Sequence, residues 1–118
     1  MKNPMTPILY KVLERAQDTA DVFTLSLAPQ NGETLEPFTA GQFNMLYVFG
    51  VGEIPISISG DPDQNDGVLI HTTRAVGTVT KGMSKLQQGD VLGVRGPFGE
   101  AWPVEAAEGQ DVVIVAGG

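Results

Sequence analysis

Alternation of apolar and polar residues along short segments is the feature that most constrains the fold of this 118-residue chain. Phe23, Leu25 and Leu27 alternate with hydroxyl-bearing residues, and a period of two places every second side chain on one face of a β-strand. Turn-forming residues separate such runs, among them 15 glycines and 8 prolines. The pattern predicts six strands, at residues 7–13, 22–27, 43–49, 54–59, 68–74 and 91–95.

Six short strands favour an all-β fold that closes into a small barrel, because closure removes the exposed edges of an open sheet. One segment, residues 77–88, breaks the pattern: Val79, Met83 and Leu86 share one face at helical spacing. It is the only helix that we predict. Thr78 is its predicted N-cap, and the Gly-Asp pair that follows is predicted to end it.

The end of the chain differs from the rest. Residues 111–118 form a continuous apolar run that ends on two glycines, which is typical of a buried parallel strand leading into a phosphate-binding turn. We therefore expect a barrel domain at residues 1–108, with residues 109–118 as the first strand and glycine turn of a truncated α/β nucleotide-binding domain. The alternative is a seventh barrel strand ending on a tail.

Composition disfavours several classes of function. The chain has 14 acidic and 7 basic side chains, a net charge of −7, which argues against binding to nucleic acid or an anionic membrane. Without cysteine, this chain cannot form a disulfide, a thiolate zinc site or an iron-sulfur cluster. No segment resembles a signal peptide or approaches the roughly 18 apolar residues of a membrane span, so we expect a cytoplasmic protein.

His71 is the only histidine. No cysteine or carboxylate stands at ligand spacing from it, so no metal site is predicted. We interpret it as a histidine built into a sheet, and a catalytic base is the alternative.

Basic residues are concentrated in one part of this acidic chain. The window from 71 to 95 holds four of them against Asp90 alone, namely Arg74, Lys81, Lys85 and Arg95. It also contains the start of the predicted helix, residues 77–80, where free amides and the helix dipole favour an anion such as phosphate. An ordinary capped helix with solvated lysines is the alternative.

A second candidate site is the strand at residues 54–59. Its alternation places three isoleucines on one face and Ser57 and Ser59 on the other. Pro55 lacks an amide hydrogen, so the strand lies at an edge or a bulge there and leaves backbone groups free for a ligand. The alternative is that both serines simply face water.

Five segments occur in an order known from one protein superfamily. They are AGQFNMLYVFG (40–50), IPISIS (54–59), TTRAVGTVT (72–80), GDVLGVRGPFG (89–99) and VVIVAGG (112–118). Together they resemble the flavin-binding domain of the ferredoxin-NADP reductase superfamily. Within it, the chain is most similar to the sulfhydrogenase gamma subunits, the corresponding flavin-binding component of anaerobic sulfite reductase and the electron-transfer subunit of dihydroorotate dehydrogenase.

The resemblance implies a six-stranded antiparallel Greek-key barrel, capped by one helix, that binds FAD or less often FMN and is followed by a domain that binds NAD(P)H. The family's Arg-x-Tyr-Ser signature aligns with residues 54–57, where isoleucines stand in place of the arginine and the tyrosine and only Ser57 is retained. By resemblance, Ser57 lies near flavin N5 and Ile56 packs on the ring. From the concentration of basic residues we infer that Arg74 replaces the lost charge. The implied flavin-binding residues are Pro55, Ile56, Ser57, Thr72, Thr73, Arg74, Gly77, Thr78, Val79 and Thr80.

The implied function is that of an FAD-binding domain in an NAD(P)H-dependent electron-transfer oxidoreductase subunit. The flavin accepts a hydride and passes electrons singly to a partner subunit with iron-sulfur or other metal centres. We expect this chain alone to bind flavin and to lack nicotinamide specificity. The alternative is a non-enzymatic barrel that binds a partner protein or another anionic ligand and has lost flavin binding.

Overall fold

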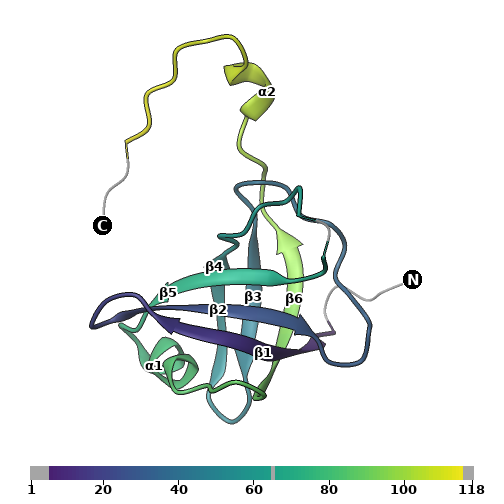
Figure 1. Ribbon diagram of the computed structural model, residues 1–118, viewed down its shortest axis with the longest axis vertical. Coiled ribbons are helices and arrows are strands. Elements are labelled where there is room, and N and C mark those ends of the chain that lie inside the picture. The colour runs from purple at the N-terminus through teal and green to yellow at the C-terminus, as the bar shows by residue number, and fades with distance from the viewer. Residues whose placement is uncertain (1–5, 65, 116–118) are drawn as a thin grey trace.

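The computed structural model describes residues 6–64 and 66–115 and places six strands and two short helices along them (Figure 1). The strands are β1 (Ile8–Gln17), β2 (Val22–Pro29), β3 (Phe43–Val48), β4 (Gly52–Ser57), β5 (Leu69–Arg74) and β6 (Val91–Phe98). The helices are α1 (Thr78–Ser84) and α2 (Val104–Ala107). All six predicted strands are present, and the largest differences in extent are at the C-terminal ends of β1 and β6.

The strands form one antiparallel sheet in the order β4-β3-β6-β1-β2-β5. The sheet curls so that its two edge strands, β4 and β5, come into contact, as the ribbon shows (Figure 1). The predicted all-β antiparallel class is confirmed. No ladder joins β4 to β5 within the described residues, so the barrel is not closed by strand pairing.

The core is built from the inward-facing side chains of the alternating strands. Phe23, Leu25 and Leu27 of β2 are fully buried, as their spacing predicts. Met83 is the buried apolar side chain of α1, and Val79 and Leu86 pack against the same core at its edge. Burial of this apolar surface is the main favourable contribution to folding, at roughly 25 cal/mol per Å².

Helix α1 is shorter than the sequence predicts, and both of its predicted ends are wrong. Its N-cap is Gly77 and not Thr78, because the hydroxyl of Thr80 accepts the Gly77 amide at 2.9 Å and makes the cap from inside the helix. The helix ends at Ser84, where the amide of Lys85 bonds to the Gly82 carbonyl three residues earlier. Gly89 instead lies in the turn that enters β6.

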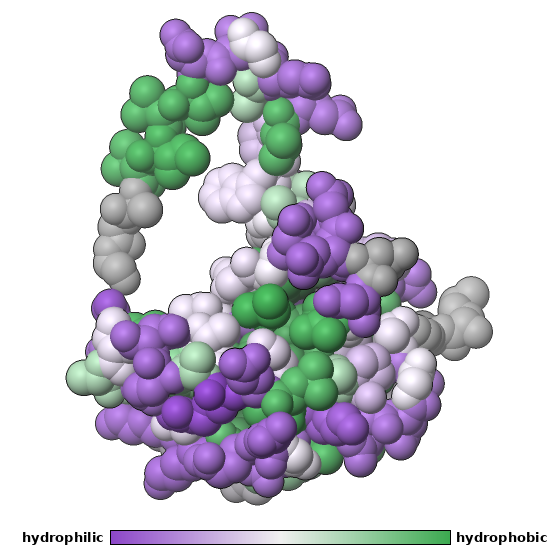
Figure 2. Space-filling view, in the orientation of Figure 1, coloured by the Kyte–Doolittle hydropathy of each residue, from purple (hydrophilic) through white to green (hydrophobic). Residues whose placement is uncertain are grey.

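The segment after the barrel departs from expectation in two ways. Helix α2 is a second helix, which periodicity could not detect in four residues that begin after Pro103. Residues 112–115 form no strand and are exposed, and this apolar segment stands apart from the barrel with its side chains uncovered (Figure 2). A strand requires a neighbour to bond with, and they pair with none of the described strands. The predicted glycine turn at Gly117 and Gly118 lies outside the described residues.

Candidate functional site

The two edge strands of the sheet meet along a line that we call the β4–β5 seam, formed by residues 57–59 and 70–72. The Ser57 carbonyl accepts a hydrogen bond from His71 Nδ1 at 3.0 Å. The amide of Ser59 donates to the Ile70 carbonyl at 2.8 Å, and its hydroxyl accepts the Thr72 amide at 3.2 Å. The chain after β4 thus bonds to β5 by individual contacts instead of a ladder.

The opposite end of β4 lies against the first turn of α1. A Cβ atom on Gly52 would stand 3.1 Å from Val79 Cγ2, so the backbone of β4 and the helix are in close contact there. Because β5 leads directly into α1, the structure brings together three predicted segments, at residues 54–57, 72–74 and 77–80. These are the segments that the family resemblance assigns to one site.

The predicted site residues divide between two faces. Pro55 and Ser57 of β4 are exposed, as are Thr72 and Arg74 of β5. Ile56 is half-buried and packs against the core. The strand alternation confirms the prediction that serine and isoleucine lie on opposite faces of β4.

Arg74 is not isolated on the surface. Its guanidinium lies 3.6 Å from the Asp21 carboxylate, and both side chains are about half exposed, at 53% and 55%. Such a pair is weak, since water screens it and both side chains lose freedom in forming it. An anion could therefore compete with Asp21 for Arg74 at small cost.

The start of α1 uses the side chain of one predicted site residue, Thr80, for its own cap. The Thr80 hydroxyl accepts the Val76 and Gly77 amides at 3.0 and 2.9 Å and donates to the Gly77 carbonyl at 3.2 Å. Thr80 is 3% exposed, so its hydroxyl is directed into the cap and away from solvent. Gly77 and Thr78 are exposed and remain accessible to a ligand.

The basic window of the sequence does not form one patch. Arg95 lies on β6 and makes a two-pronged ion pair with Glu53, with Nε to Oε2 at 2.7 Å and Nη2 to Oε1 at 2.8 Å. These hydrogen bonds lower the pKa of Glu53 and raise that of Arg95. Arg95 is therefore bound to a carboxylate of β4, whereas Lys81 and Lys85 are exposed on and just after α1.

His71 is buried in the sheet, as predicted. Burial lowers the pKa of His71 to about 4. The hydrogen bond to Ser57 raises the pKa but offsets only part of this effect. The neutral ring donates from Nδ1, because a carbonyl can only accept, and so Nε2 must accept from Asn44 Nδ2 at 3.3 Å. The contacts thereby define both the tautomer of His71 and the orientation of the Asn44 amide.

Two buried oxygens near the seam have no hydrogen-bond partner among the described residues, Asn44 Oδ1 and Thr73 Oγ1. The sequence analysis did not single out Asn44. A signal for it exists, since Asn44 precedes Leu46 and Val48 in the alternating inward set of β3. A lone amide among inward apolar positions indicates a buried polar partner, here His71.

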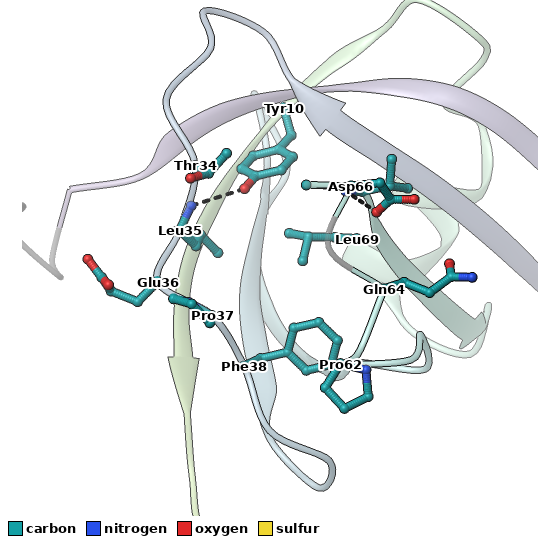
Figure 3. A pocket seen from close by; sticks show the side chains of 12 residues that line it. Tyr10, Thr34, Leu35, Glu36, Pro37, Phe38, Pro62, Gln64, Asp66 and Leu69 are labelled. Atoms are coloured by element: carbon teal, nitrogen blue, oxygen red, sulfur yellow. Dashed lines mark hydrogen bonds between the residues drawn. The ribbon is translucent and has the colours of Figure 1, made fainter.

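Two described pockets lie away from the predicted site. One, of about 470 Å³, opens beside Tyr10, Leu35 and Leu69, where the Leu35 amide donates to the Tyr10 hydroxyl at 3.1 Å (Figure 3). Burial raises the pKa of Tyr10. The other, of about 750 Å³, is lined by Phe38 and Trp102 among others. The Figure 3 pocket lies at the Leu69 end of β5, and the predicted site lies at the Arg74 end.

Sequence comparison finds relatives among electron-transfer subunits. The gamma subunit of sulfhydrogenase 2 from Pyrococcus furiosus is 34% identical over 98% of this chain and 40% of its own length. A protein of Methanopyrus kandleri, named as the probable electron-transfer subunit of dihydroorotate dehydrogenase B, is 37% identical over 95% of this chain and 39% of its own. The chain therefore spans about two fifths of these relatives. No family model matches the sequence.

Solved structures share the fold. A cytochrome P450 reductase from Amycolatopsis superposes with a TM-score of 0.72 and 30% identity, over 86% of this chain and 31% of that one. A ferredoxin-NADP+ reductase from Neisseria gonorrhoeae, with bound FAD and NADP, gives a TM-score of 0.60 at 22% identity over 74% and 35% of the two chains.

Fold and sequence together define a ferredoxin reductase-like barrel domain. The chain has the fold of ferredoxin reductase-like domains, and it is a homologue of the sulfhydrogenase gamma subunits and of the electron-transfer subunits of dihydroorotate dehydrogenase. In the described part of the chain, no helix is long and apolar enough to cross a membrane.

Proposed function

We propose that residues 1–108 are the FAD-binding domain of an NAD(P)H-dependent electron-transfer oxidoreductase subunit, and that residues 109–118 begin its nucleotide-binding domain. The names of the relatives support electron transfer, and the bound FAD and NADP of the N. gonorrhoeae reductase support the pair of cofactors. The partner that receives the electrons would be a larger subunit with an iron-sulfur or other metal centre.

The observation that supports this proposal most directly is that three separate sequence segments, at residues 54–57, 72–74 and 77–80, meet beside the β4–β5 seam. Ser57 contacts His71 and Gly52 contacts Val79, so β4 is held between β5 and the start of α1. An extended ligand could follow this line from Ser57 to Gly77 without breaking a strand ladder. A flavin dinucleotide has the required elongated shape.

The residues present fit a flavin with fewer charged contacts than the family signature provides. Ile54 stands at the signature arginine, and Thr80 is committed to the helix cap. Exposed Thr72, Gly77 and Thr78 remain as polar contacts. The Thr73 hydroxyl has no described partner, but it is buried on the core side of β5 and offers no contact to a ligand on the exposed face.

Each part of the proposed flavin site would have a distinct role. A bound flavin supplies the conversion between two-electron and one-electron transfer. We assign Ser57 to the N5 edge of the ring, Pro55 to its apolar surface, and Thr72 and Arg74 to its polar side. The side chains of Ile56 and Thr73 face the core from the same two strands and would support the site from within. The backbone of residues 77–80, with Val79 packed on β4, would hold the pyrophosphate.

The loss of the signature arginine also favours a second candidate function, a barrel that binds a partner protein or another anionic ligand without flavin. Both candidates preserve the fold. They differ in one property, since only the first requires that the purified chain bind FAD.

Absorbance and fluorescence titration of the chain with FAD tests the proposal. A tryptophan at exposed Ser57 should block the seam, whereas Thr34→Trp, which is exposed beside the Figure 3 pocket, serves as the matched control. We expect FAD to bind the wild type and Thr34→Trp and to bind Ser57→Trp at least tenfold more weakly. Absence of FAD binding by a folded wild type would favour the second candidate.

A further inference from the structure

A series of contacts around His71 crosses the interior of the barrel and ends at the Ser57 carbonyl. It starts at Gly96 of β6, where an added Cβ would overlap Asn44 Oδ1, so the backbone of β6 lies directly against this amide. Asn44 of β3 then donates to His71 of β5, and His71 donates to the Ser57 carbonyl of β4. Four strands are thus linked by side-chain and backbone packing, in addition to their ladders.

This series of contacts is important because Ser57 is the last residue of β4 that pairs with β3 in the ladder. Its register partner on β3 is Phe43, and beyond it the chain turns to bond with β5 through Ser59. At this junction, the hydrogen bond from His71 Nδ1 determines how far β4 stands from β5. His71 and Asn44 are both fully buried, at 0% exposure, so water cannot replace either partner.

We propose that His71 is a positioning residue for the flavin edge: through its Nδ1 hydrogen bond to the Ser57 carbonyl it sets the place of Ser57 at the seam. This inference rests on the proposed flavin site and adds a residue that touches no ligand itself. Asn44 fixes the ring, because its amide donor at Nε2 requires the tautomer that carries hydrogen on Nδ1. The pair therefore acts through the backbone of β4.

Two amide replacements separate the two ring nitrogens. His71→Asn places an amide donor near the position of Nδ1 and retains the bond to Ser57, whereas His71→Gln places it near Nε2 and loses that bond. Val12→Ala is the control for general destabilisation, since Val12 is buried in β1, which pairs with β2 and β6 and not with the seam strands β4 or β5 for any part of the described chain.

The measurements are the FAD dissociation constant, the midpoint potential of the bound flavin, and amide hydrogen exchange at Ser59 without FAD. We expect His71→Gln to weaken FAD binding roughly tenfold, to shift the potential and to speed exchange at Ser59. His71→Asn should restore most of each change, and Val12→Ala should alter none. If His71→Gln does not fold, Asn44→Ala takes its place, with a smaller effect of the same sign.

The outcomes distinguish this inference from the proposed function. If the wild type binds FAD and His71→Gln matches His71→Asn within twofold in affinity, with the same potential, then the positioning role is overturned and the flavin site stands. A wild type that is folded but does not bind FAD overturns the flavin site and the positioning role together.

Discussion

The β1–β2 ladder and the β4–β5 seam are two ways of joining neighbouring strands in one barrel. Along β1 and β2, backbone pairing continues from Tyr10 and Pro29 to Gln17 and Phe23, with one irregularity after Val12. At the seam, individual hydrogen bonds of Ser57, Ser59 and His71 take the place of a ladder. A continuous ladder stabilises the sheet and pairs the backbone groups of both strands, so a ligand cannot contact them. A seam leaves backbone and side-chain groups that a ligand can contact.

The two regions also differ in what they bury. The ladder buries Tyr10, Phe23 and Leu25, which contribute through apolar area. In and beside the seam, the buried residues include His71, Asn44 and Thr73, and the last two each carry an oxygen without a described partner. A buried unsatisfied polar group costs free energy, so the region of the seam contributes less to the stability of the fold than the ladder does. Four mutational predictions sharpen this contrast, from the largest expected change in stability to the smallest.

Phe23→Ala should have the largest effect on stability and little on ligand affinity. Phe23 is fully buried on β2, and truncation of such a side chain costs about 3–5 kcal/mol through lost burial and the cavity that remains. Urea unfolding measures this loss. The control is Phe49→Ala, because Phe49 is 53% exposed and should lose about 1 kcal/mol or less. Equal losses of unfolding free energy in the two variants would contradict the stabilising role of buried apolar area in the ladder.

His71 should make the free energy of unfolding depend on pH. Its pKa is about 4 in the folded chain against an ordinary 6.5, so the unfolded chain binds more protons between these values. The stability that neutral His71 provides is complete above pH 6.5 and is lost as the pH falls toward 4. The slope is about 1.4 kcal/mol per pH unit, which gives a loss of about 2–3 kcal/mol between pH 7 and pH 4.5.

Urea unfolding at pH 7, 6, 5 and 4.5 tests this slope, and His71→Asn should remove it. Glu53 does not cause the same loss of stability over this range. Its hydrogen bond to Arg95 lowers its pKa, so its contribution to the free energy of unfolding is lost at lower pH. A wild-type protein of constant stability over this range would show that His71 is accessible to protons in the folded state, contrary to its burial.

Thr80 should contribute to stability through the cap of α1. Thr80→Val keeps the shape of the side chain but removes the acceptor of the Val76 and Gly77 amides, and we expect a loss of about 1–2 kcal/mol, as for other helix caps. Thr80→Ser retains the hydroxyl and should recover most of it. Thermal unfolding of the three proteins measures the difference, and equal stability of Thr80→Val and wild type would contradict the cap.

The sequence was sufficient for the strands but not for the places where strands meet. Alternation identified β2 because Phe23, Leu25 and Leu27 are buried without exception. It stopped short on β1, where the irregularity between Val12 and Glu14 shifts the phase. It also stopped short on β6, where the Gly96-Pro97 pair has the composition of a turn although the strand continues to Phe98.

The seam could be predicted only in part. The family resemblance named Ser57 and Thr72, yet their proximity follows from the curling of the whole sheet, because β4 and β5 are at opposite ends of the strand order. Thr80 lies in the segment predicted to bind a phosphate, but its hydroxyl is directed inward and caps the helix. Spacing alone could not distinguish these roles, since both use the same hydroxyl at the same turn.

Arg74 gives the prediction with the smallest effect on stability and a direct bearing on the seam. Its pair with Asp21 at 3.6 Å is exposed, so Asp21→Asn and Arg74→Ala should each change the free energy of unfolding by about 0.5 kcal/mol or less. Their effects on FAD affinity should be opposite in sign. Arg74→Ala removes a charge-assisted phosphate contact and should weaken binding roughly tenfold, whereas Asp21→Asn releases Arg74 and should strengthen it up to about threefold. Fluorescence titration at low and high salt measures both, and salt should reduce both differences because the contacts are exposed. If neither variant changes the affinity, Arg74 does not replace the missing arginine, and the flavin must be held by the uncharged groups of the seam alone.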